Sequence, residues 1–199
     1  MGTIKTTNIE PIADNGTVTL GSSGDTFTVP SGVTVNMSSA TQTGVGGVNT
    51  PSFFAFKSGS QSANSNTATK LTFDDELWDV GGVYDNSTNY RFTPGFVGKS
   101  NISAGFWSYD SAELLYQQDI ELYKNGSMFA SFQDRFLGST ATLQRKWTNF
   151  NMNVSHSAND YFEIYGKFRT TDNNTANIVS SSDSNSSPFN YFTAFKIIE

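Results

Sequence analysis

The chain has 199 residues, among them 17 Phe, 8 Tyr and 3 Trp, and its 18 acidic and 12 basic residues give a net charge of −6. The absence of Cys excludes disulfides and thiolate metal ligands, and the acidic balance without a Lys/Arg cluster argues against a nucleic-acid partner. No segment approaches the roughly 18 consecutive apolar residues of a membrane helix, and residues 1–7 lack the apolar core of a signal peptide. We therefore expect neither membrane insertion nor a secretion signal.

The first fifty residues differ from the rest in their pattern of apolar and polar residues. An extended arm over residues 4–14 precedes three short runs of alternating apolar and polar residues, Thr17–Leu20, Thr26–Val29 and Val33–Met37, which Gly, Ser, Asp and Pro turns separate. Each run is too short to stand alone, since an isolated hairpin is only marginally stable. Two arrangements remain open: a stalk in which three copies of the chain bury their apolar stripes together, or a small β-meander packed on its own domain.

A glycine-rich, uncharged connection follows at residues 41–51. We place the domain boundary there, with an anchor arm and short β-stalk over residues 1–50 and a globular head over residues 51–199. Strands are predicted in the head near residues 53–57, 69–73, 90–93, 100–109, 114–124, 127–136, 140–150, 161–169 and 191–198. The polar spacers Ser58–Asn66 and Asp172–Ser187 are expected to be too hydrophilic to be buried. Many strands without a helical period indicate an all-β sandwich.

Several short motifs follow one another in a definite order along the head. They are Phe73-Asp74, Gly82, Tyr84-Asp85, Phe92-Thr93-Pro94, Lys124-Asn125-Gly126, Asn159-Asp160 and Phe192-Thr193-Ala194-Phe195. In this order they resemble the globular head of complement component 1q and of the tumour necrosis factor superfamily, over roughly the C-terminal three-quarters of the chain. Asn159 and Ala194 depart from the pattern, because glycines stand there in the family.

The resemblance implies a jelly-roll β-sandwich that forms a homotrimer, with aromatic faces meeting near the threefold axis and loops displayed outward. Under this interpretation the candidate residues of the trimer interface or core are Phe54, Phe56, Tyr109, Tyr165 and Phe195. Exposed rings flanked by Asn, Asp or Gln are typical of surfaces that bind sugars or proteins. The candidates for such surface recognition are Trp78, Tyr90, Phe96 and Trp147.

Few residues offer catalytic or metal chemistry. The carboxylates of Asp74, Asp75, Glu76 and Asp79, close to Asp85, lack the alternating ligand spacing of a calcium loop, so we interpret them as solvated surface groups. The single histidine, His156, has no thiolate or second imidazole with which to form a zinc site, and we expect it on the surface or in a loop. We predict no catalytic residue, no metal, no cofactor and no enzymatic activity.

Three hypotheses of function follow. The first is a virion structural protein of bacteriophage type on the particle surface, a trimeric fibre or capsid decoration. Its residues 1–50 would contact other virion proteins, and its head would stabilise the particle or bind a host-surface glycan or protein. The alternative is a non-viral, secreted complement-q-like recognition module or lectin. The third is a glycan hydrolase or esterase, which the carboxylates do not support because none lies in a catalytic context.

Overall fold

A computed structural model describes residues 9, 17–35, 49–135, 142–179 and 190–197. The chain divides into two compact units, residues 1–45 and 46–199, and each is described by itself. The domain boundary predicted between residues 50 and 51 stays a prediction, and the arm predicted over residues 4–14 lies outside the described residues except for Ile9.

The described part of the N-terminal unit, residues 17–35, forms turns joined by extended chain. One turn has a hydrogen bond from Asp25 N to Ser22 O (3.0 Å), and a second has a hydrogen bond from Val33 N to Pro30 O (3.3 Å). The expected strands at Thr17–Leu20 and Thr26–Val29, and the described part of the third, are not formed, and the side chains are exposed. The physical reason is that no described segment of this unit supplies a partner for ladder hydrogen bonds, and a lone strand is not stable.

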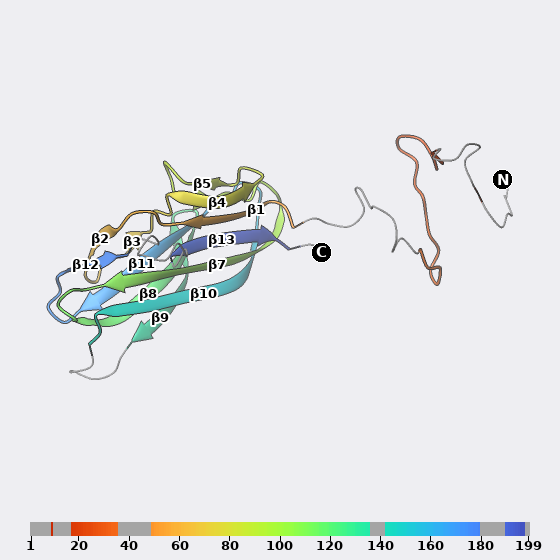
Figure 1. The fold of residues 1–199 in the computed structure, drawn as a ribbon. Helices are drawn as coiled ribbons and strands as arrows, with labels where there is room; N and C mark the ends of the chain where they lie inside the picture. Colours follow the sequence, from red (N-terminus) through yellow and green to blue (C-terminus); the bar gives the residue numbers. More distant parts are fainter. Residues whose placement is uncertain (1–8, 10–16, 36–48, 136–141, 180–189, 198–199) are drawn as a thin grey trace. The chain divides into compact units, whose positions relative to one another are not determined.

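The described part of the head contains thirteen strands and no helix (Figure 1). They are β1 (Ser52–Phe56), β2 (Gln61–Asn64), β3 (Thr69–Lys70), β4 (Asp75–Val80), β5 (Tyr84–Asp85), β6 (Arg91–Phe92), β7 (Gly98–Tyr109), β8 (Leu115–Lys124), β9 (Ser127–Arg135), β10 (Arg145–His156), β11 (Phe162–Thr170), β12 (Thr175–Ile178) and β13 (Tyr191–Lys196).

These strands form two antiparallel sheets. Sheet A has the order β2-β12-β7-β13-β1-β4. Strands β12 and β13 pair with different parts of one edge of β7, and β10 pairs with the other edge. Sheet B has the order β5-β6-β11-β8-β9, with β3 paired to β11. In Figure 1 the long strands β7, β13 and β10 lie beside one another, as their registers require. The all-β sandwich predicted from the sequence is confirmed.

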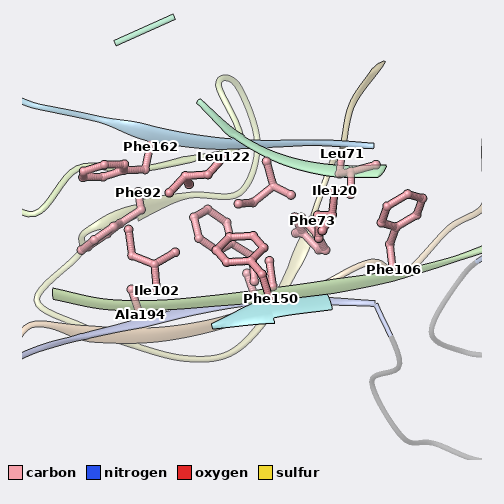
Figure 2. Close-up of a cluster of buried hydrophobic side chains, with 14 of the residues drawn as sticks. Leu71, Phe73, Phe92, Ile102, Phe106, Ile120, Leu122, Phe150, Phe162 and Ala194 are labelled. Atoms are coloured by element: carbon pink, nitrogen blue, oxygen red, sulfur yellow. The ribbon is translucent and has the colours of Figure 1, made fainter. Parts of the chain in front are cut away.

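The core lies between the sheets and consists mainly of aromatic rings. Figure 2 shows Phe162, Leu122 and Ile120 of sheet B facing Ile102, Phe106 and Phe150 of sheet A. The alternation of buried and partly exposed residues along most of β11 and β7 follows from the period of two in a strand. Each of these strands therefore presents one row to the core and a second row to the outside.

Two of the predictions about polar segments are wrong. The spacers Ser58–Asn66 and Asp172–Ser187 contain strands β2 and β12, which pair with each other. Ala63, Ala176 and Ile178 on these strands are buried. A strand needs only every second residue to be apolar, so a segment with a low mean hydropathy can still cover the core with one face.

Candidate functional site

The outer face of sheet A carries a continuous row of five aromatic side chains from five different strands. We call these residues the aromatic row; they are Trp78 (β4), Phe54 (β1), Tyr191 (β13), Trp147 (β10) and Trp107 (β7). The ring centroids of neighbours in the row are 5.2 Å apart for Phe54 and Trp78, 5.6 Å for Phe54 and Tyr191, 6.1 Å for Trp147 and Tyr191 and 6.3 Å for Trp107 and Trp147. All four spacings are those of favourable aromatic pairs.

Gly105 on β7 leaves the space in which Trp147 joins the aromatic row. The indole of Trp147 lies over this glycine, where an added Cβ would come within 2.6 Å of two ring atoms. Any other residue at position 105 would push the indole away from the sheet, because Cβ contacts that short do not occur. The glycine therefore allows a side chain of β10 to reach across β7 toward Tyr191 of β13.

The row is not covered by any other described part of the head. Trp78 is 46 % exposed, and Phe195 and Val80 on the same face are 39 % and 47 % exposed. Beside them, the amides of Asn101, Asn151 and Asn153 form a polar border, in which Asn101 Nδ2 donates to Asn151 Oδ1 (3.0 Å) and Asn153 Oδ1 (2.8 Å). An apolar patch with a polar border is the usual composition of a protein–protein interface.

The five predicted interface or core residues do not share one face. Phe54, Phe56, Tyr109 and Phe195 lie on the outer face of sheet A, by their registers with neighbouring strands and their alternation with buried residues. Tyr165 instead lies on the outer face of sheet B, where its ring stacks on Tyr123 with centroids 4.0 Å apart.

The four candidates for surface recognition separate into two groups. Trp78 and Trp147 belong to the aromatic row. Tyr90 ends a turn and has a φ of 51°, and Phe96 lies in the loop before β7, with its ring against His156 at a centroid distance of 4.8 Å. The structure therefore brings two of the four together and leaves the other two in separate loops.

Sequence reasoning missed two members of the aromatic row, Trp107 and Tyr191. Their strands were predicted, but the outer face could be identified only from which residues lie opposite one another. Tyr191 is opposite both Phe56 and Gly105. The pairing of the C-terminal strand with both β1 and β7 was the information that the sequence lacked.

A cavity of about 520 Å³ lies at one end of the head. Its walls come from the chain entering β1, the turn after β4 and the loop after β6, and include Pro51, Val80, Val83, Pro94 and Phe96. No titratable side chain lines it. Its polar side chains are the hydroxyls of Thr50 and Thr93, so none of its lining residues is a carboxylate, imidazole or amine that could act as a general acid or base.

The clustered carboxylates act as caps of loops rather than as a metal site. The two oxygens of Asp79 accept hydrogen bonds from the backbone N–H groups of Val83 and Tyr84, both at 3.0 Å. Asp85 accepts from the N–H groups of Ser87, Thr88 and Asn89, and these bonds hold the pKa of its carboxyl well below the usual range. Among the described residues no group of three or more His, Cys, Asp or Glu could hold a metal ion.

The expectation that His156 lies on the surface or in a loop is wrong, because it ends β10 and is only 6 % exposed. Its Nδ1 lies 3.2 Å from the carbonyl oxygen of Phe96, and its Nε2 lies 2.9 Å from Ser100 Oγ. A carbonyl only accepts, so Nδ1 carries the proton and Nε2 accepts from the serine hydroxyl. Burial lowers the pKa of this imidazole below its ordinary value.

We expect acid to destabilise the head through His156. Above its ordinary pKa of about 6.5 the imidazole is neutral in both states and contributes no pH dependence; below it the unfolded chain binds the proton and the folded head does not. The free energy of unfolding should therefore fall between about pH 7 and about pH 5. Urea unfolding of the wild type and of His156→Gln at both pH values checks this.

The glutamine variant should show a flat response over that interval, since the chain has a single histidine. The carboxyls of Asp85 and Asp160, whose pKa values are lowered, weaken the fold only at lower pH, near and below the ordinary carboxyl pKa of about 4. An unchanged slope in His156→Gln would refute the assignment.

In the part of the chain that the structure describes, no helix is long and apolar enough to cross a membrane.

Comparisons with known proteins support the fold. No family model matches the chain, and no curated protein matches it in sequence. Among solved structures, the Eiger tumour necrosis factor of S. frugiperda is similar with a TM-score of 0.54 and 7% identity, over 74% of this chain and 92% of that chain. The globular domain of zebrafish complement 1qA protein has a TM-score of 0.49 and 14% identity, over 75% of this chain and 98% of that chain. At such identities the likeness to the Eiger structure shows the fold alone, and the predicted jelly roll is confirmed.

Proposed function

We propose that the chain is a homotrimeric virion structural protein of bacteriophage type, a fibre or capsid decoration exposed on the particle surface. Its head stabilises the particle or attaches it to a host-surface glycan or protein. The proposal includes no enzymatic activity and no cofactor. The observation that carries it is the uncovered aromatic row on sheet A.

The row supports a threefold assembly because it is wide and apolar. Burying an aromatic side chain removes about 150–250 Å² of surface from water, at about 25 cal/mol per Å² of apolar area. Leaving five such rings partly exposed on one face is unfavourable for an isolated head, and a closed ring of identical copies covers the face on every subunit. The jelly-roll fold is compatible with such a ring.

The N-terminal unit supports the anchoring part of the proposal. Its described segments alternate exposed apolar residues with polar ones, as at Val18 and Leu20, Phe27 and Val29, and Val33 and Val35. Phe27 is 71 % exposed. Such segments lack a partner within one chain, and three copies or a neighbouring virion protein would supply one.

The mass of the purified protein in solution tests the assembly. Sedimentation equilibrium of the full chain is expected to give three times 21.7 kDa. Removal of residues 1–50 should leave the head trimeric, because the aromatic row lies wholly in the head. A head that sediments as a compact monomer at micromolar concentration would contradict the proposal.

The virion context requires a separate experiment. An antibody raised against the head is expected to label the surface of phage particles from a lysate of cells in which the gene is expressed. Particles that lack the protein, combined with free trimer in the culture medium, would instead favour a secreted recognition module.

A further inference from the structure

The outer face of sheet B differs in character from the aromatic face of sheet A. Along β11 the residues that point outward are Glu163, Tyr165, Lys167 and Arg169, which alternate with the buried Phe162, Ile164 and Phe168. Directly opposite residues on paired strands share a face. Lys167 is opposite Asp119, and Arg169 is opposite Gln117, which is also opposite Arg135.

This face gathers positive charge on a chain that is acidic as a whole. Its five cations are Lys70, Arg91, Arg135, Lys167 and Arg169, and its four acidic residues by the same registers are Asp85, Asp119, Glu121 and Glu163. The whole chain has 12 basic and 18 acidic residues. The cations are thus concentrated here beyond the average of the chain.

Three of these cations, Arg135, Lys167 and Arg169, form what we call the basic end of the face. No ion pair joins any of the three to a carboxylate within the described ranges, whereas Lys70 is paired with Glu163 at 2.5 Å. The nearby Asp119 accepts from Gln117 Nε2 at 3.0 Å with both of its oxygens. Arg169 Nε is buried and has no hydrogen-bond partner among the residues described. The charge of the basic end is therefore not neutralised by an ion pair within the described residues, so it can attract an anionic ligand.

Beyond the basic end the same face offers an aromatic platform. The stacked rings of Tyr123 and Tyr165 lie beside Glu121, which is opposite Tyr165. The five residues from Tyr165 to Arg169, which are four steps along an extended strand, span about 13 Å. Cations and aromatic rings therefore lie in one line along this face, an arrangement that suits an extended anionic chain of sugar rings.

We propose that the outer face of sheet B binds an acidic polysaccharide, with the basic end holding its carboxylate or sulfate groups and the tyrosine pair packing against its sugar rings. This inference deepens the attachment role proposed above and leaves sheet A free for the trimer. The choice of polysaccharide over duplex nucleic acid rests on the small number of cations. The basic end has only three, on a chain whose net charge is −6, whereas proteins that bind duplexes commonly neutralise about six to ten phosphates.

The test measures binding of the full chain to immobilised dextran sulfate and polygalacturonate, with neutral dextran as a blank and duplex DNA as a competitor polymer. Wild-type protein is expected to bind at least one acidic polysaccharide, with an affinity that falls steeply between about 50 mM and about 200 mM salt. The double change Lys167→Gln with Arg169→Gln should weaken binding at least about tenfold, because two charge-assisted contacts are lost.

The matched controls keep the result interpretable. Lys99→Gln removes one charge from sheet A and should leave binding unchanged, and Lys167→Arg with Arg169→Lys keeps both charges and should retain most of it. If the double glutamine variant fails to unfold cooperatively, the single change Lys167→Gln replaces it, with an expected loss of about threefold.

Equal binding by the wild type and the folded glutamine variant, no binding of wild type to either polysaccharide at low salt, or tighter binding to duplex DNA would each overturn the inference. Sedimentation of the same samples reports the trimer separately. A failure of the assembly is thereby distinguished from a failure of this binding face.

Discussion

Replacing Phe54 by lysine is expected to convert the trimer into a folded monomer. Phe54 occupies the middle of the aromatic row, with Trp78 on one side and Tyr191 on the other, and its strand pairs on both edges. An ammonium group there would be buried between subunits without a carboxylate partner, which costs several kcal/mol, about 3–5 for an uncompensated buried charge. A trimer would contain three such ammonium groups, one on each subunit, so the unfavourable free energy would apply three times. Sedimentation velocity and far-ultraviolet circular dichroism of the variant check mass and fold together.

Tyr165→Lys is the matched control, because it introduces the same charge on the opposite sheet. The new ammonium would lie opposite Glu121 on β8 and opposite Lys70 on β3, and the sedimentation coefficient should stay that of the trimer. If Tyr165→Lys dissociates the assembly and Phe54→Lys does not, the interface lies on sheet B and the proposed assembly is wrong.

Replacing Phe53, the residue immediately before Phe54, by alanine is expected to damage the fold rather than the assembly. Phe53 is fully buried, stacks on Tyr84 with centroids 4.7 Å apart, and contacts Phe92 and Phe192 at 5.2 and 5.0 Å. Loss of this ring leaves a cavity among three others and should lower the free energy of unfolding by about 3–5 kcal/mol. Urea denaturation in the Phe54→Lys background measures this without a contribution from protein concentration.

Phe56→Ala on the same strand serves as the comparison. Its side chain lies on the outer face, opposite Tyr191, so the monomeric background should lose at most about 1 kcal/mol. Similar losses for Phe53→Ala and Phe56→Ala would show that β1 does not present alternate residues to the core and to the outside as described.

The contrast between Phe53 and Phe54 also shows what the sequence could predict. The run of aromatic residues at 53–56 indicated a strand, and the ordered motifs at Tyr84, Phe92 and Phe192 indicated the two-sheet fold. Turn residues also placed the hairpin at Asn125 and Gly126, where both φ angles are positive. These signals are local, because they depend on residues close together in the chain.

The distribution of the aromatic residues between the core and the outer faces of sheets A and B depends on contacts between residues that are far apart in the sequence. Phe54 and Tyr165 both occur in runs of alternating type, and only the pairing of β1 with β13 and of β11 with β8 places them on different sheets. His156 was misplaced for the same reason, because Ser100 and Phe96, which enclose it, are more than fifty positions away. Polar strands such as β12 were missed because pairing, rather than hydrophobicity, makes them strands.

The start of β1, the first strand of the head, lies beside the end of β13, its last strand. Ser52 at the start of β1 lies opposite Phe195 near the end of β13, and Lys196 N donates to Pro51 O at 3.1 Å. The polypeptide thus enters and leaves the head at the same pole. The β7–β8 connection at residues 110–114 lies at the opposite pole, because Gly105, opposite Tyr191, precedes it along β7. Cargo fused to either terminus would start from one pole, and a peptide epitope inserted at 110–114 would be displayed from the other.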